Sequence, residues 1–273
     1  MLYAIRDFDD AYANAAHIPD GASYPSRWTE EAASFRTACG KRMRADIAYG
    51  QGPRNRLDLF LPDGTPRGLV VFIHGGYWMR FGKEFWSHLA AGPLAHGFAV
   101  AMPGYTLCPD TTISGITREM TAALETASSL VDGPIVLTGH SAGGHLAARL
   151  ACRDVAMHDA LRARIRRIVP LSGLFDLRPL LHTTMNETLR LTSAEAQAES
   201  PALLEPFGPM DVICWVGAGE RAEFIRQNAL LANVWRGLGL ATACVEEPDR
   251  HHFNVIDGLK DGNSALVQAL VGT

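Results

Sequence analysis

Short apolar runs separated by turn residues recur along the chain, and most of them are typical of buried β-strands. Eight strands are expected, at residues 43–49, 55–61, 68–73, 98–102, 135–137, 167–171, 212–216 and 241–246. Short turns rich in Gly and Pro separate the first three, which indicates an antiparallel start. Longer segments separate the later ones, which indicates parallel strands joined by helical crossovers.

Several of the longer segments have the apolar spacing of helices. Helices are expected near residues 84–96, 116–130, 223–238 and 263–271. The alternation of strand and helix predicts an α/β protein with an eight-stranded, mostly parallel sheet and helices on both faces. Residues 1–273 are expected to form one domain.

Two segments lie outside this alternation. Residues 1–40 carry Tyr24, Trp28 and Phe35 at loose spacing, and we expect an arm with one or two short helices packed over the body. Residues 176–209 form the one long interruption between a strand and its successor. A connection of that length in a compact domain is usually functional, so a small lid is expected there.

A nucleophile motif follows the strand expected at residues 135–137. Gly139-His-Ser-Ala-Gly143 matches G-x-S-x-G, in the strand-to-helix context that the motif requires. A serine on so tight a turn needs strained backbone angles, and glycines on either side avoid collisions. The turn exposes the Ser141 hydroxyl, and the Ala142 amide faces any oxyanion formed there. The alternative is a glycine-rich helix cap without chemistry.

A glycine pair ends the strand expected at residues 68–73. Backbone N–H groups at Gly75 and Gly76 can approach a substrate oxygen and complete an oxyanion hole with Ala142. Tyr77 and Trp78 follow directly and, with Phe81, are candidates for lining an aromatic substrate pocket. A plain Gly-Gly turn and core aromatic residues are the competing interpretation.

A serine nucleophile needs a histidine and a carboxylate, and late loops of the chain supply both. Glu220 comes directly after the strand at 212–216, whereas Glu223 already begins the next helix, so Glu220 is favoured. Asp176 is a remoter alternative. His251 and His252 both follow the last strand, and spacing alone does not choose between them.

Composition restricts the classes of partner. A net charge of −4 argues against a nucleic-acid partner, and the basic cluster at residues 162–167 is expected to be a solvated approach to a strand. The ten histidines show no metal-ligand spacing, so no metal site is expected. The five cysteines are scattered without C-x-x-C spacing and are expected to be buried thiols in a reducing compartment.

The N-terminal residues lack the apolar core of a signal peptide, and no run is long enough for a membrane span. A cytoplasmic enzyme acting on a small molecule, without membrane association, fits these observations.

Beyond single motifs, the chain resembles α/β-hydrolases of the kynurenine formamidase (arylformamidase) type. The resemblance is carried by His74-Gly-Gly-Tyr-Trp78, Tyr105-Thr-Leu-Cys-Pro109, Gly139-His-Ser-Ala-Gly-Gly-His145, Leu171-Ser-Gly-Leu-Phe-Asp-Leu177, Thr184-Met-Asn186, Glu199-Ser-Pro201, Glu223-Phe224 and His252-Phe253. The elbow and the His-Gly-Gly are shared with many esterases. The stretch from Leu171 to Pro201 is more specific.

The resemblance implies Ser141 as nucleophile, His252 as base because the family histidine precedes a phenylalanine, and Glu220 as the acid. The family usually has aspartate at the acid, and His251 replaces an acidic residue. The implied reaction is hydrolysis of an N-formyl arylamine such as N-formylkynurenine to formate and the amine. The resemblance implies no metal or organic cofactor, and it implies a homodimer.

Two alternatives stay open. A carboxylesterase or thioesterase acting on small acyl groups would use the same machinery. A non-catalytic ligand-binding member of the fold is the more remote one, because the chain carries Ser141, His252 and an acid candidate.

Overall fold

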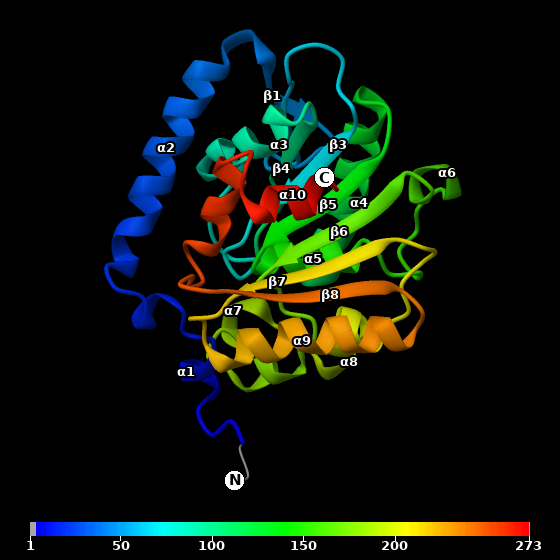
Figure 1. Ribbon diagram of the computed structural model, residues 1–273. Helices are drawn as coiled ribbons and strands as arrows, with labels where there is room; N and C mark the ends of the chain where they lie inside the picture. Colours follow the sequence, from blue (N-terminus) through cyan, green and yellow to red (C-terminus); the bar gives the residue numbers. More distant parts are fainter. Residues whose placement is uncertain (1–3, 273) are drawn as a thin grey trace.

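The computed structural model describes residues 4–272, whose centre is one eight-stranded sheet (Figure 1). Its strands are β1 Met43–Ala48, β2 Arg56–Phe60, β3 Leu69–Ile73, β4 Ala99–Pro103, β5 Ile135–His140, β6 Ile165–Leu171, β7 Asp211–Gly217 and β8 Ala241–Glu247. They are arranged in the order β1-β2-β4-β3-β5-β6-β7-β8. β1 pairs antiparallel with β2 and β2 with β4, and every other pair is parallel.

The central strands are buried on both faces, which explains their continuous apolar sequences. In β3, Leu69, Val71 and Ile73 belong to one hydrophobic core, whereas Val70 and Phe72 belong to the other. Successive side chains of a strand point to opposite faces, so one strand contributes to two cores. The sheet therefore needs a layer of helices on each side.

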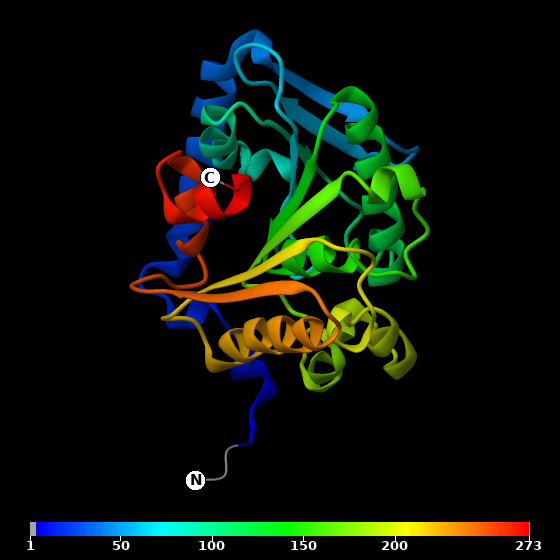
Figure 2. The same cartoon turned by 45° about the vertical axis from the view of Figure 1, so that its right-hand side comes forward.

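Helices form both layers (Figure 2). They are α1 Phe8–Tyr12, α2 Tyr24–Cys39, α3 Ala91–Ala95, α4 Ile113–Leu130, α5 Ala142–Arg149, α6 Asp159–Arg162, α7 Asn186–Leu189, α8 Ser193–Ala198, α9 Ala222–Gly237 and α10 Ala265–Val271. α3 and α10 cover one face with α2 outside them, and α4, α5 and α9 cover the other. The predicted α/β-hydrolase sheet and its antiparallel start are confirmed.

Two expectations about helices are wrong. Residues 84–96 do not form one helix: two 3₁₀ turns precede the short α3, because Pro93 has no N–H to bond the Leu89 carbonyl and so cannot continue a helix from that side. The arm also carries a longer helix than expected, since α2 has 16 residues and begins with Pro25 in its first turn.

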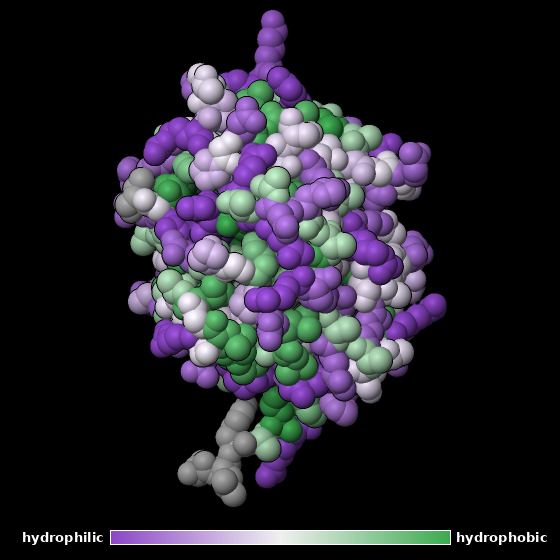
Figure 3. All heavy atoms as spheres, turned by 90° about the vertical axis from the view of Figure 1, so that its right-hand side faces the viewer, coloured by the Kyte–Doolittle hydropathy of each residue, from purple (hydrophilic) through white to green (hydrophobic). Residues whose placement is uncertain are grey.

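The segment at residues 176–209 contains α7, α8 and short 3₁₀ turns and packs beside α5 and α9 (Figure 1). Four cysteines are buried as expected, but Cys244 is exposed because β8 is an edge strand. No helix among residues 4–272 has the length and apolarity needed to cross a bilayer. On the face seen in Figure 3, hydrophilic side chains are interspersed with the hydrophobic ones.

Candidate active site

Ser141 lies on the sharp turn between β5 and α5, in a strained backbone conformation. Its φ is 56° and its ψ is −117°, a region that residues with a side chain rarely adopt. The neighbouring glycines make the turn possible: a Cβ on Gly143 would lie 1.9 Å from the Ile73 carbonyl oxygen, and one on Gly139 would lie 2.4 Å from that of Gly143. The elbow therefore depends on glycine at both positions.

A buried histidine and carboxylate form a pair beside this turn. His252 Nδ1 lies 2.6 Å from Glu220 Oε2, and the two side chains are 4% and 0% exposed. A carboxylate accepts, so Nδ1 carries the proton and Nε2 keeps its lone pair. Ser141 and His252 line the same cavity. The arrangement has the parts of a serine hydrolase triad: a nucleophile and a histidine on one cavity, with a carboxylate on the far nitrogen of the histidine.

Glu220 is fixed by two further hydrogen bonds to its other oxygen. The Gly217 amide donates to Oε1 over 2.9 Å, and the Ser172 hydroxyl donates to the same atom. Ser172 is itself buried, with a φ of 50°, directly after β6. Sequence reasoning missed Ser172, although a polar residue directly after a buried parallel strand is a usable signal.

The competing candidates are engaged elsewhere. Asp176 pairs with Arg178 at 2.9 Å, and these hydrogen bonds outweigh the effect of burial and lower its pKa. Glu223 pairs with Arg226 and accepts a 2.6 Å hydrogen bond from the Tyr12 hydroxyl. His251 lies 3.1 Å from the Tyr24 hydroxyl, on the side of the arm.

Free backbone amides face the elbow. Gly75 and Gly76 donate to no protein acceptor within residues 4–272, and Ala142 is the first residue of α5, where amides lack an intrahelical partner. A Cβ on Gly75 would lie 3.1 Å from the Cβ of Ser141, so this loop passes close to the serine. The amides of Gly75, Gly76 and Ala142 are candidates for an oxyanion hole.

His140, the elbow residue before the serine, contacts the loop that carries the base. Its Nε2 donates to the His252 carbonyl oxygen over 2.8 Å, and the two rings are 4.6 Å apart. Burial, together with the neighbouring His252, lowers the pKa of His140 well below its usual value. It therefore stays neutral and supports the loop that carries the base.

A cavity of about 580 Å³ opens over Ser141 and His252. Tyr77 lines it as predicted, but Trp78 does not: its side chain is fully buried and packs edge-on against His145. Trp78 belongs to the hydrophobic core on one face of the sheet, so its expected contact with substrate is wrong.

The N-terminal arm forms much of the cavity wall, which sequence reasoning did not assign to the site. Tyr12, Asn14 and Trp28 line it, as do Thr184 and Met185 from the segment at 176–209. The Tyr77 hydroxyl donates to the Tyr12 carbonyl over 2.5 Å and accepts from the Asn14 amide over 3.2 Å. The arm is thus attached to the loop beside the oxyanion hole.

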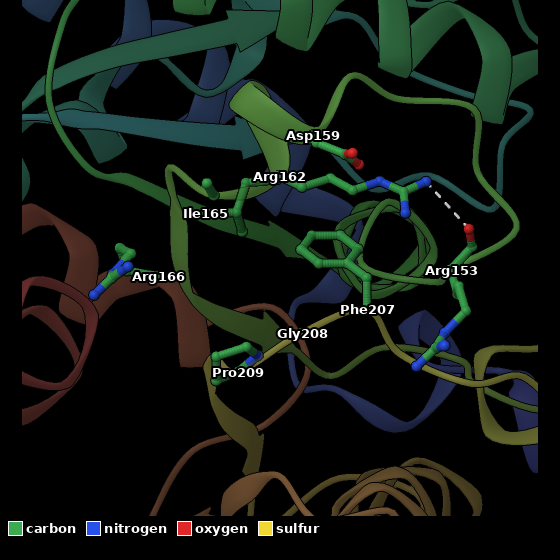
Figure 4. A pocket seen from close by; sticks show the side chains of 9 residues that line it. Arg153, Asp159, Arg162, Ile165, Arg166, Phe207, Gly208 and Pro209 are labelled. Atoms are coloured by element: carbon green, nitrogen blue, oxygen red, sulfur yellow. Dashed lines mark hydrogen bonds between the residues drawn. The ribbon is translucent and has the colours of Figure 1, made fainter.

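A second pocket lies at the other end of the sheet, beside the start of β6 (Figure 4). It holds about 540 Å³ and is lined by Arg153, Arg162, Arg166 and Phe207 among others. Arg162 stacks over the Phe207 ring and donates to the carbonyl of Arg153, while Arg166 turns away from both. No group of three or more His, Cys, Asp or Glu that could hold a metal occurs within residues 4–272.

Comparisons with known proteins agree with this geometry. A model described as "Alpha/beta hydrolase family" matches residues 70–259. Kynurenine formamidase of Salmo salar is 32% identical over 242 residues, covering 83% of this chain and 80% of that protein. Kynurenine formamidase of Danio rerio is 29% identical over 237 residues, with the same coverage.

A solved structure gives a further relative. A protein of Silicibacter sp. described as a "putative thioesterase" is 48% identical and superimposes with a TM-score of 0.93, covering 97% of this chain and 99% of that one.

Proposed function

The chain belongs to the alpha/beta hydrolase family, and from that premise we propose that it hydrolyses a small N-formyl aryl amide such as N-formylkynurenine. The products would be formate and the free arylamine. Ser141, His252 and Glu220 serve as nucleophile, base and acid in this proposal, and relatives named kynurenine formamidase support it.

The observation that carries the substrate class is the aromatic end of the cavity. The half-buried rings of Phe81 and Phe253 line the cavity next to His252, and Trp28 and Trp86, which are almost wholly buried, pack against them at the cavity wall. Trp28 lies 4.6 Å from Trp86 and 5.3 Å from Phe253, measured between ring centroids. A flat aryl ring gains both apolar burial and edge-to-face contacts in such surroundings.

The first half of the reaction uses the triad directly. The Ser141 hydroxyl adds to the formyl carbon while His252 Nε2 takes its proton. Negative charge develops on the formyl oxygen, where the amides of Gly75, Gly76 and Ala142 donate to it. Glu220 holds the imidazole in the required tautomer and stabilises the cation. The imidazolium then protonates the leaving nitrogen, the C–N bond breaks and the arylamine departs.

Water completes the cycle. His252 takes a proton from a water molecule, whose oxygen adds to the formyl ester on Ser141. The ester C–O bond breaks, the serine regains its proton from the imidazolium, and formic acid leaves and loses its remaining proton to the solvent to become formate. No redox change occurs, and the proton balance closes in each turnover.

Hydrolysis of a small ester or thioester is the second candidate. The cavity of about 580 Å³ is larger than a formyl group and an aryl ring alone require, and the protein that is 48% identical is described as a "putative thioesterase". An acyl chain of several carbons could occupy the space on the side of Thr184 and Met185.

Paired rate measurements separate these candidates. We expect purified protein to hydrolyse N-formylkynurenine with a kcat/KM in the usual enzyme range of about 10⁴–10⁸ M⁻¹s⁻¹. p-Nitrophenyl acetate and an acyl thioester serve as comparison substrates, and Ser141→Ala is the control. Turnover of esters or thioesters alone, through Ser141, would replace the formamidase by the second candidate.

A further inference from the structure

The loop after the Gly-Gly pair is held in a strained conformation. Gly76, Tyr77, Trp78 and Phe81 all have positive φ, at 114°, 50°, 58° and 68°. Non-glycine residues in this region cost on the order of 1–3 kcal/mol each, so the surrounding contacts must fix them. The two other residues of this loop, Met79 and Arg80, both line the cavity, so the fixed backbone also determines where Arg80 leaves the chain.

Three neighbours of Arg80 are each anchored. The Tyr77 hydroxyl bonds to the arm, the Trp78 carbonyl accepts from the Cys108 amide over 2.8 Å, and the Phe81 carbonyl accepts from the Arg54 guanidinium. Phe81 also packs among aromatic rings.

Arg80 itself is exposed and lines the cavity. Its guanidinium makes no hydrogen bond or ion pair with any residue in the range 4–272. The cation is therefore available to a ligand in the cavity.

A carboxylate lines the same cavity from the arm. Asp9, on α1, accepts at Oδ1 from the Thr184 amide over 2.7 Å and from the Thr184 hydroxyl over 2.9 Å. These contacts fix Asp9 while its side chain stays exposed. Within residues 4–272, Asp9 and Arg80 are the only Asp, Glu, Lys or Arg side chains that line this cavity.

We propose that Arg80 and Asp9 determine specificity by binding the carboxylate and the ammonium group of an α-amino acid substrate. The inference rests on the proposed function and deepens it. The aryl ring lies among Trp28, Trp86 and Phe253, the formyl group lies at Ser141, and the zwitterionic end of the substrate lies between one cation and one anion. Guanidinium matches a carboxylate with two parallel hydrogen bonds, which makes Arg80 the stronger determinant.

Direct binding tests this without relying on turnover. Calorimetric titration measures the Kd of kynurenine, the product that retains the amino acid group, and of 2-aminoacetophenone, which keeps the aminophenyl ketone but lacks the amino acid group. We expect Arg80→Ala to raise the Kd of kynurenine by about 10- to 100-fold, the range for hydrogen bonds between charged groups. The Kd of 2-aminoacetophenone should stay within about twofold, which also shows that the cavity remains folded.

Two more variants sharpen the result. Arg80→Lys keeps the charge but loses the paired hydrogen bonds, so we expect it to restore part of the affinity. Asp9→Asn keeps an oxygen for Thr184, and it should weaken the binding of kynurenine but not that of 2-aminoacetophenone, which lacks the α-amino group. Arg166→Ala, in the other pocket, is the matched control and should change neither Kd.

The outcomes separate this inference from the proposed function. Three outcomes would each overturn the assignment of Arg80. They are an equal loss of affinity for both ligands in Arg80→Ala, an unchanged affinity of that variant for kynurenine, and no binding of kynurenine by the unaltered protein. The protein could bind kynurenine through Arg80 and yet not hydrolyse N-formylkynurenine. That result would support the amino acid site and reject the formamidase function.

Discussion

Two cavities of similar volume lie at opposite ends of the sheet, and only one of them has the structure of an active site. The cavity over Ser141 holds about 580 Å³ and the arginine-lined pocket about 540 Å³. The first lies where the parallel strands end, at the edge where ligands bind in open α/β sheets. The second lies where β6 begins, at Ile165.

The two cavities differ in how their polar groups are used. In the arginine-lined pocket, Arg162 donates to the carbonyls of Arg153 and Val155, so its charge supports the local backbone. In the other cavity, His252 and Arg80 line the space that a ligand would fill, and the Arg80 side chain makes no hydrogen bond or ion pair within residues 4–272. Volume therefore does not identify the site; strained backbone and polar groups left for a ligand do.

The largest test of this contrast is a pair of substitutions, one in each cavity. Ser141→Ala removes the nucleophile, and we expect kcat to fall by a factor on the order of 10⁶. Arg166→Ala removes an exposed charge at the other end, and kcat should stay within about twofold. Steady-state rates on the preferred substrate of the protein measure both. Comparable activity in Ser141→Ala and the unaltered protein would reject the serine mechanism.

A second test distinguishes Glu220 from Asp176 as the acid that pairs with His252. Glu220→Gln keeps the shape of the acid but presents an amide that can donate to His252 Nδ1, which favours the wrong tautomer. We expect kcat to fall about 10⁴-fold. Asp176→Asn is the matched control, because its partner is Arg178, and its kcat should change by less than about threefold. A large loss of kcat in Asp176→Asn, with little loss of kcat in Glu220→Gln, would make Asp176 the acid in place of Glu220.

Much of the sheet and elbow could be predicted because short-range rules determine them. Eight apolar runs became eight strands, and Gly139 and Gly143 have the steric role that their spacing indicated. Sequence spacing could not decide which of His251 and His252 is the base, since the side chains of adjacent residues point in different directions from the same place in the fold. The structure separates them through Glu220 and Tyr24, which lie far from His251 and His252 in the chain.

The cavity wall could not be predicted for the same reason. Tyr12 and Trp28 reach the cavity only because the arm folds back over the strand ends, and nothing local to them indicates that. Trp78 lies in the core although its neighbour Tyr77 lines the cavity, and the two aromatic residues have similar positive φ values that no local sequence signal indicates.

The smallest test uses pH, since the elbow end of the molecule has buried groups that titrate whereas arginines do not. Burial lowers the pKa of both His74 and His145 to about 3. The unfolded chain, with histidine pKa values near 6.5, therefore binds more protons between pH 6.5 and 3, and stability falls as the pH drops through that window.

For one such histidine the loss at pH 5 is about 2 kcal/mol relative to pH 7. Denaturant unfolding of His145→Gln should show a decrease in stability from pH 7 to pH 5 that is smaller by this amount. Arg162→Ala should lower stability equally at both pH values, because the guanidinium stays charged throughout. An unchanged pH dependence in His145→Gln would show that the acid sensitivity arises elsewhere, and the contrast between the two ends of the sheet would then be one of catalysis alone.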